Sequence, residues 1–234
     1  MGLTRRVVAN DVRTATRDRT LAAMLVVPVI FLLLLRWGLP ALERFVEVAP
    51  EVATAAHAAL CSVAALFPAF LLAMIMLDEK DLQMPQVYRV LPVPGWRLLA
   101  MRILPVLVLG LLYAVLLVAL GGQVGRGPVE VLLLAAACAA PGPVAVLLAL
   151  ALSSNKIEGL ALFKMIFFVT VLAGGGLFVT TGLGLALRVI PTYWTYSAFA
   201  ADGPLPPAPS VLVAVTGHLV LGAVCYRRLA RAAP

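Results

Sequence analysis

Six long stretches without a single charged residue dominate this 234-residue sequence. A membrane-crossing helix needs about 20 mostly apolar residues, because the hydrocarbon core is about 30 Å thick and a helix rises about 1.5 Å per residue. Since an unpaired charge at the bilayer centre costs roughly 2.5–3.5 kcal/mol, charge-free stretches are the sharpest signal of such helices. They cover residues 20–35, 52–77, 103–125, 131–155, 165–187 and 203–226. The pattern predicts an all-α integral membrane protein with six transmembrane helices.

The composition leaves no room for a separate soluble domain. Charged residues make up 12% of the chain and hydrophobic residues 63%, whereas soluble domains carry about 25% charged residues. We therefore expect one membrane domain over residues 1–234. Its six helices are predicted at about 20–39, 52–77, 99–121, 130–153, 160–183 and 210–226.

Basic residues fall mainly on one side of the predicted helices. With six crossings, the segments 1–20, 78–102, 156–164 and 227–234 share a side with both termini. An excess of Lys and Arg marks the cytoplasmic side of membrane proteins, so we expect both termini in the cytoplasm. These segments carry 14 of the 18 basic residues, namely Arg5, Arg6, Arg13, Arg17, Arg19, Lys80, Arg89, Arg97, Arg102, Lys156, Lys164, Arg227, Arg228 and Arg231.

The first 19 residues form a basic, amphipathic pattern. Leu3, Val7, Val8, Val12 and Ala15 share one helical stripe. Such a helix tends to lie in the membrane surface with its arginines among anionic lipid head groups. The sequence predicts an interfacial helix over residues 1–19, and a disordered basic tail is the alternative. The arginines of its polar side are Arg5, Arg6, Arg13 and Arg17.

The apolar stretch after Lys164 is longer than one crossing requires. Three glycines interrupt it at 174–176, and it ends in an aromatic segment that contains Tyr193, Trp194 and Tyr196. Tyr and Trp are enriched where a membrane meets water. We expect one crossing followed by a short re-entrant element, with these aromatic residues in an interfacial belt.

Few residues in the sequence could carry chemistry. Cys61, Cys138 and Cys225 lie in apolar runs without metal-binding spacing, and we expect them to be buried. His57 and His218 have no HExxH spacing, and each is expected to be packed or near an interface. No GxxxxGK[ST] loop is present, so the chain lacks the usual phosphate cradle for ATP. The sequence predicts no catalytic residue, cofactor or metal site in this chain.

The segment between the second and third predicted helices is the most informative part of the sequence. It opens with Asp78-Glu79-Lys80-Asp81 and reaches Pro94 through an apolar stretch containing Tyr88. A short helix across the membrane plane, ended by prolines, would fit this pattern. An ordinary charged loop is the alternative.

This segment resembles the coupling loop of ABC-2 type permeases, the transmembrane subunits of bacterial ABC exporters. In that family the loop carries a helix that docks into the ATP-binding subunit. The usual Gly-Thr before the helix is missing here, whereas the acidic opening and the LPVP turn are present. The resemblance implies that the coupling residues are Asp78, Glu79, Lys80, Asp81, Tyr88, Arg89, Val90, Leu91, Pro92, Val93 and Pro94.

A second segment, between the fourth and fifth helices, is similar to the NNKVEG…K segment of small drug- and antibiotic-export permeases of the same family. It runs from Ser153 to Lys164, and its matching positions are Asn155, Lys156, Glu158 and Lys164. Six crossings and an amphipathic first helix also fit the family pattern.

The resemblance implies a complex of two permease subunits, identical or related, with separate subunits that bind ATP and Mg²⁺. It implies export across the bacterial plasma membrane of a hydrophobic or amphipathic small molecule or lipid, along spans 1, 2 and 5. No nucleic-acid partner is expected. An ion-coupled secondary transporter, the substrate-capturing subunit of an energy-coupling-factor importer and a membrane enzyme are the alternatives; the absence of mid-span carboxylates disfavours the first.

Overall fold

The computed structural model describes residues 3–84, 93–122, 126–179, 182–200 and 202–232, with the side chains of 3–8, 183 and 232 outside that description. Within these ranges the regular structure is helical, without strands. Six helical segments are long and apolar enough to cross a membrane, which confirms the predicted fold class. They are Arg19–Glu43, Pro50–Asp81, Gly95–Leu120, Pro128–Leu152, Lys156–Leu177 and Pro207–Arg231.

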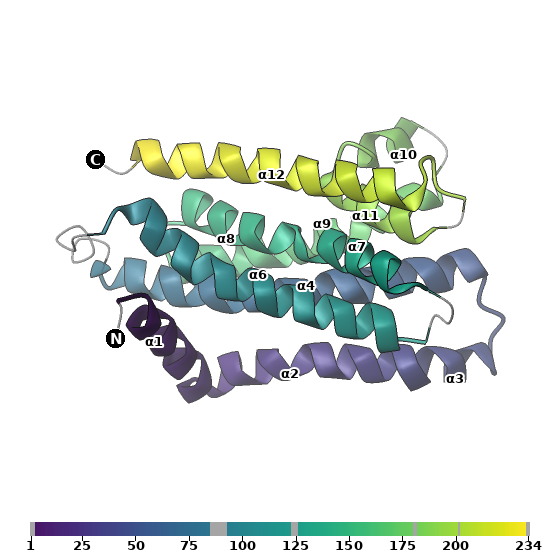
Figure 1. Cartoon of the computed structure of the whole chain (residues 1–234), viewed down its shortest axis with the longest axis horizontal. Helices are drawn as coiled ribbons and strands as arrows, with labels where there is room; N and C mark the ends of the chain where they lie inside the picture. Colours follow the sequence, from purple (N-terminus) through teal and green to yellow (C-terminus); the bar gives the residue numbers. More distant parts are fainter. Residues whose placement is uncertain (1–2, 85–92, 123–125, 180–181, 201, 233–234) are drawn as a thin grey trace.

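The first two crossings are preceded by a short helix that lies at an angle to the bundle (Figure 1). This helix, α1, ends at Arg17, and Asp18 caps the next helix by accepting hydrogen bonds from the backbone N–H groups of Thr20 and Leu21. The segments are α1 (Leu3–Arg17), α2 (Arg19–Leu33), a π-helical turn η1 (Leu34–Gly38), α3 (Leu39–Glu43) and α4 (Pro50–Asp81).

The remaining helices complete the bundle and return the chain to the end where it began. Both termini lie at the same end of the bundle (Figure 1). The segments are α6 (Gly95–Leu120), α7 (Pro128–Ala139), α8 (Pro141–Leu152), α9 (Lys156–Gly174), a 3-10 turn η2 (Gly175–Leu177), α10 (Gly182–Leu187), α11 (Pro191–Phe199) and α12 (Pro207–Ala232). The helices α7 and α8 form one crossing that is broken next to Pro141.

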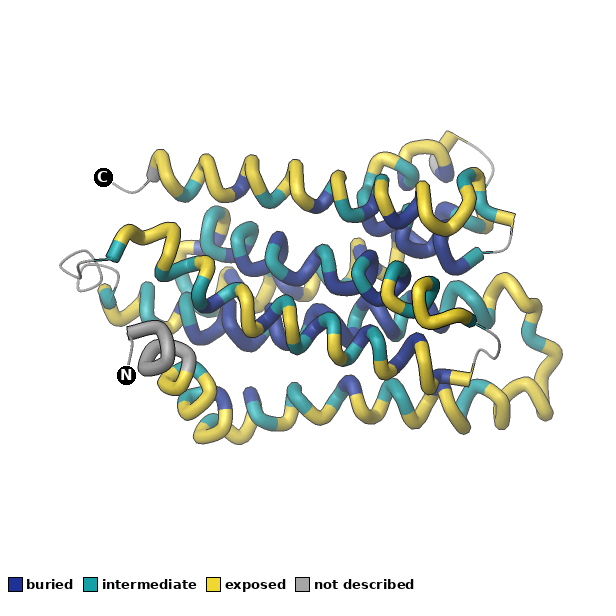
Figure 2. Tube along the Cα trace, in the orientation of Figure 1, coloured by how far each residue is buried: buried dark blue, intermediate teal, exposed yellow. Residues whose placement is uncertain are grey.

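Helix α4 is the centre of the bundle, as its dark colour in Figure 2 shows. It packs against α2, α6, α8 and α9, and its buried face is rich in alanine. Helices in lipid have no hydrophobic driving force for association, so they associate through close packing, which small residues permit. A Cβ atom at Gly110 of α6 would lie 2.8 Å from the carbonyl oxygen of Ala65, so glycine sets the α4–α6 distance.

Two short helices, α10 and α11, lie between the last two crossings at the end of the bundle away from the termini (Figure 1). The predicted interfacial aromatic belt is wrong for Tyr193 and Tyr196, which are 1% exposed. Their rings pack where Gly176 and Gly174 leave space, and the Tyr196 hydroxyl donates a 2.9 Å hydrogen bond to the carbonyl of Thr170. The two rings therefore pack in the core at this end of the bundle and do not anchor the protein in the membrane interface.

The predicted burial of the cysteines and histidines is confirmed. Cys61, Cys138 and Cys225 are free and buried. His57 and His218 are 1% and 5% exposed.

Candidate functional site

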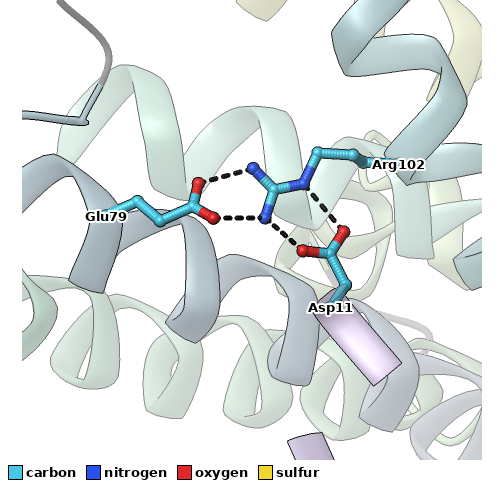
Figure 3. Close-up of polar contacts among 3 residues, drawn as sticks. All are labelled: Asp11, Glu79 and Arg102. Carbon is cyan, nitrogen blue, oxygen red and sulfur yellow. Dashed lines mark hydrogen bonds and ion pairs between the residues drawn. The ribbon is translucent and has the colours of Figure 1, made fainter. Parts of the chain in front are cut away.

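A buried arginine joins side chains of three helices (Figure 3) near the end of the bundle that holds both termini (Figure 1). Arg102, in the second turn of α6, binds Asp11 of α1 through Nε (2.9 Å) and Nη2 (2.6 Å). It binds Glu79 of α4 through Nη1 (2.5 Å) and Nη2 (2.9 Å). The Arg102 side chain is 1% exposed, and the two carboxylates are 13% and 15% exposed. We call these three residues the Arg102 cluster.

The cluster has the geometry of two bidentate ion pairs that share one guanidinium. The planar fork of arginine matches two carboxylates in a way that lysine cannot. The pKa of Asp11 is raised above its ordinary value. Burial is the largest cause, and the hydrogen bonds and charge of Arg102 oppose it. Arg102 engages both oxygens of each carboxylate, so the cluster holds α1, α4 and α6 in one arrangement.

A second group of polar contacts at the same end of the bundle joins α4 to the end of α8 and the start of α9. Lys80 Nζ donates hydrogen bonds to the backbone carbonyls of Ser153 (2.7 Å) and Leu150 (3.4 Å), at the end of α8. A cation there suits the negative end of the helix dipole. Asn155 then caps α9, because its side-chain oxygen accepts a 2.9 Å hydrogen bond from the N–H of Glu158.

The two predicted site segments meet at this point. The backbone N–H of Lys156 donates to an Asp81 carboxylate oxygen (3.1 Å), and Lys156 Nζ lies 3.2 Å from Asp78 Oδ1. Gly159 packs so closely against Leu77 that any side chain there would collide with it. The glycine of the 153–164 segment therefore permits close contact between α9 and α4.

The predicted residues thus have different places in the structure. Asp78, Glu79, Lys80, Asp81, Asn155, Lys156 and Glu158 come together, whereas Lys164 is exposed on α9 without a hydrogen bond or ion pair among the described residues. Pro94 is the N-cap of α6, and Val93 precedes it. Arg13 and Arg17 are exposed on α1. Tyr88, Arg89, Val90, Leu91 and Pro92, and the side chains of Arg5 and Arg6, lie outside the described residues.

Sequence reasoning missed Asp11 and assigned Arg102 only a place among the cytoplasmic basic residues. Two signals pointed to them. Arg102 falls inside the predicted third helix, where an arginine needs a partner. Asp11 is the only acidic residue within the first 17 positions, on a helix that is otherwise basic.

Replacing Lys80 with methionine is expected to lower the free energy of unfolding by about 1–2 kcal/mol, because the last carbonyls of α8 lose a charged donor. Denaturant or thermal unfolding of the purified protein measures this loss. The Lys164→Met variant is the matched control, with an expected change within about 0.5 kcal/mol because Lys164 is exposed. Equal stability of the two variants would show that the Lys80 contacts contribute nothing.

The fold and these polar contacts define the class of the protein. It is a multi-pass membrane protein with six crossings and a network of charged side chains at the end of the bundle that holds both termini. Among the described residues, no group of three or more His, Cys, Asp or Glu side chains is placed to hold a metal ion.

Comparison with known proteins gives the family. The chain belongs to the family described as fluoroquinolones export permease protein Rv2686c-like, whose model matches residues 11–226. Two relatives are the fluoroquinolones export permease proteins Rv2686c and MT2760 from two strains of Mycobacterium tuberculosis. Each is 27% identical over 205 residues, covering 81% of this chain and 79% of the relative. No solved structure matches the chain. The family confirms the resemblance to drug-export permeases and identifies the chain as a transmembrane permease.

Proposed function

We propose that this permease is the transmembrane subunit of an ATP-driven exporter, and that a separate ABC subunit binds ATP and Mg²⁺. The observation that carries the proposal is the network at residues 78–81. Through Glu79 this segment is fixed to α1 and α6, and through Asp81 and Lys80 it is fixed to α8 and α9. A displacement of the adjoining loop would therefore be transmitted through α4 to α1, α6, α8 and α9.

The proposed coupling works as a rigid lever. Residues 82–94, called loop 82–94 for their position in the sequence between α4 and α6, connect these two helices, and the Arg102 cluster ties the end of α4 to the start of α6. Closure of the ATP-binding subunits would shift this pair of helices as one body, together with α1. Movement of packed helices as rigid units is a common way to switch a membrane pathway between its two openings.

An aromatic cluster supports a pathway along spans 1, 2 and 5. The ring of Phe67 in α4 lies 6.0 Å from that of Phe31 in α2 and 5.4 Å from that of Phe167 in α9. All three side chains are half-buried. Aromatic rings favour stacking with a planar, amphipathic cargo. A drug of the fluoroquinolone type, which the relatives' names specify, suits this surface.

The proposal includes a second permease subunit, identical or related. Spans 1 and 5 expose apolar side chains on both sides of the aromatic cluster, including Val29 and Leu33 on α2 and Phe168 and Leu172 on α9. A partner that covered these stripes would enclose Phe31, Phe67 and Phe167 in a shared pathway. With both termini in the cytoplasm of a bacterial cell, loop 82–94 would face the ATPase.

Replacing Leu91 with aspartate tests this function. If the loop docks in an ABC subunit, a buried charge in the contact should prevent co-purification of that subunit and reduce transport-linked ATP hydrolysis at least tenfold. Val90→Asp should act in the same way.

The control is Phe45→Asp, which places the same charge on an exposed apolar position at the other end of the bundle. Normal complex formation and normal ATP hydrolysis by the Leu91→Asp complex would contradict the proposal. Transport by the purified permease alone, driven by a proton or sodium gradient, would also do so.

A further inference from the structure

An apolar groove of about 860 Å³ runs along the side of the bundle between α6 and α12. Figure 1 shows these two helices on either side of α7 and α8, which form the floor of the groove. Small residues make it concave, in particular Ala139 and Ala140 on the floor and Gly222 on α12.

The interior of the groove offers almost no polar group. His218 reaches it, but its ring nitrogens are engaged by the carbonyl of Ala214 (2.7 Å) and the hydroxyl of Thr192 (3.4 Å). The groove therefore suits a hydrocarbon ligand. It is separate from the aromatic cluster of α2, α4 and α9, whose residues do not line it.

One end of the groove has an aromatic and basic rim. Trp96 and Tyr226 lie there and are 52% and 40% exposed. Arg97 lies 5.2 Å from the Trp96 ring centre, and Arg227 directly follows Tyr226. Helix periodicity places Arg97 at the edge of the face of α6 that lines the groove, since it lies next to the lining residue Trp96 and three positions before the lining residue Ala100.

The same spacing places Arg227 beside the groove, four residues after the lining residue Ala223. Neither α6 nor α12 contains an Asp or Glu residue. Within the described part of the chain, Arg97 and Arg227 take part in no ion pair. An anionic group at this end of the groove would therefore meet two guanidinium groups.

The length, lining and charge of the groove favour a lipid as its occupant. From Trp96 to Leu111 the groove follows α6 for about 22 Å. Its apolar walls suit extended acyl chains, and the positive charge at its rim suits an anionic head group.

We propose that this groove is a binding site for an anionic phospholipid, with its acyl chains against α6, α8 and α12 and its phosphate at Arg97 and Arg227. Trp96 and Tyr226 lie at the depth of the lipid glycerol region, where such side chains prefer to be. The inference rests on the membrane fold and does not depend on ATP coupling.

Fluorescence quenching by brominated lipids tests the proposal. In a variant with Trp37→Phe and Trp194→Phe, Trp96 is the remaining tryptophan. Brominated phosphatidylglycerol should quench it at a mole fraction at least about fivefold lower than brominated phosphatidylcholine, since a single basic residue strengthens anionic-lipid binding by about that factor. Native mass spectrometry of the unmodified protein should independently show retention of phosphatidylglycerol over phosphatidylcholine.

Two pairs of variants separate the head-group contacts from the groove. Neutralising the rim with R97Q and R227Q should abolish the preference, whereas R36Q and R44Q, at exposed arginines of the opposite end, should retain it. Gly222→Phe, which fills the groove, should reduce retention of lipid; Val220→Phe, on an exposed position outside it, should not.

Three results would overturn the proposal. They are equal quenching by both lipids, a preference that survives neutralisation of the rim, and quenching by neither lipid. The last result would mean that a protein segment covers the groove.

Discussion

Replacing Arg102 with methionine is expected to lower the free energy of unfolding by about 3–5 kcal/mol, the loss typical of a buried ion pair that loses one partner. The variant leaves the carboxylates of Asp11 and Glu79 largely buried and close to each other, without the cation that both bind. Thermal or denaturant unfolding of the purified protein in detergent measures the loss.

The matched control is Arg97→Met, an exposed arginine on the same helix, for which a change within about 0.5 kcal/mol is expected. Arg102→Lys should fall between the two, because an ammonium group keeps the charge but cannot bind both carboxylates in a bidentate way. If Arg102→Met unfolds at the same temperature as Arg97→Met, the cluster does not stabilise the fold.

A version of the Arg102 cluster without charges distinguishes its effect on the stability of the protein from its effect on transport. Combining Arg102→Met with Asp11→Asn and Glu79→Gln removes all three charges, and should restore much of the stability because no uncompensated charge stays buried. If the cluster transmits movement from loop 82–94 as proposed, this triple variant should still transport poorly. Full recovery of transport would limit the cluster to a structural role.

The six crossings followed from the sequence because the cost of a charge in hydrocarbon is large compared with every other local preference. The return of both termini to one end follows from an even number of crossings. The same reasoning could not say which faces of the helices meet. Lipid is as apolar as the leucines and alanines that pack in the bundle, so hydrophobicity does not distinguish a lipid-facing residue from a buried one.

The wrong prediction for the tyrosines and the missed pairing of Asp11 with Arg102 both arise because the sequence does not show which helix faces meet. Tyr193 and Tyr196 have the composition of an interfacial belt, and only the glycines at 174 and 176, on a different helix, reveal that their rings are buried. Asp11 and Arg102 are 91 residues apart in sequence, so no local pattern pairs them. By contrast, the contact between residues 78–81 and 153–158 joins two segments that were each predicted as site residues.

Replacing Gly110 with alanine is expected to destabilise the protein by about 1–3 kcal/mol, although alanine is the better helix former by about 1 kcal/mol. The added Cβ would lie 2.8 Å from the carbonyl oxygen of Ala65, and because backbone cannot rotate away, α4 and α6 must separate. Gly110→Leu should have a larger effect. Unfolding of the purified variants in detergent measures the change.

Gly222→Ala is the matched control, because it makes the same change in the middle of α12. Its Cβ would lie 3.5 Å from a methyl group of Val144, which is an ordinary contact, so we expect unchanged or slightly increased stability. The contrast tests whether glycine sets the distance between the two helices that the Arg102 cluster ties together. If Gly110→Ala is as stable as Gly222→Ala, α4 and α6 are not held at the separation described here, and a rigid α4–α6 lever loses its structural basis.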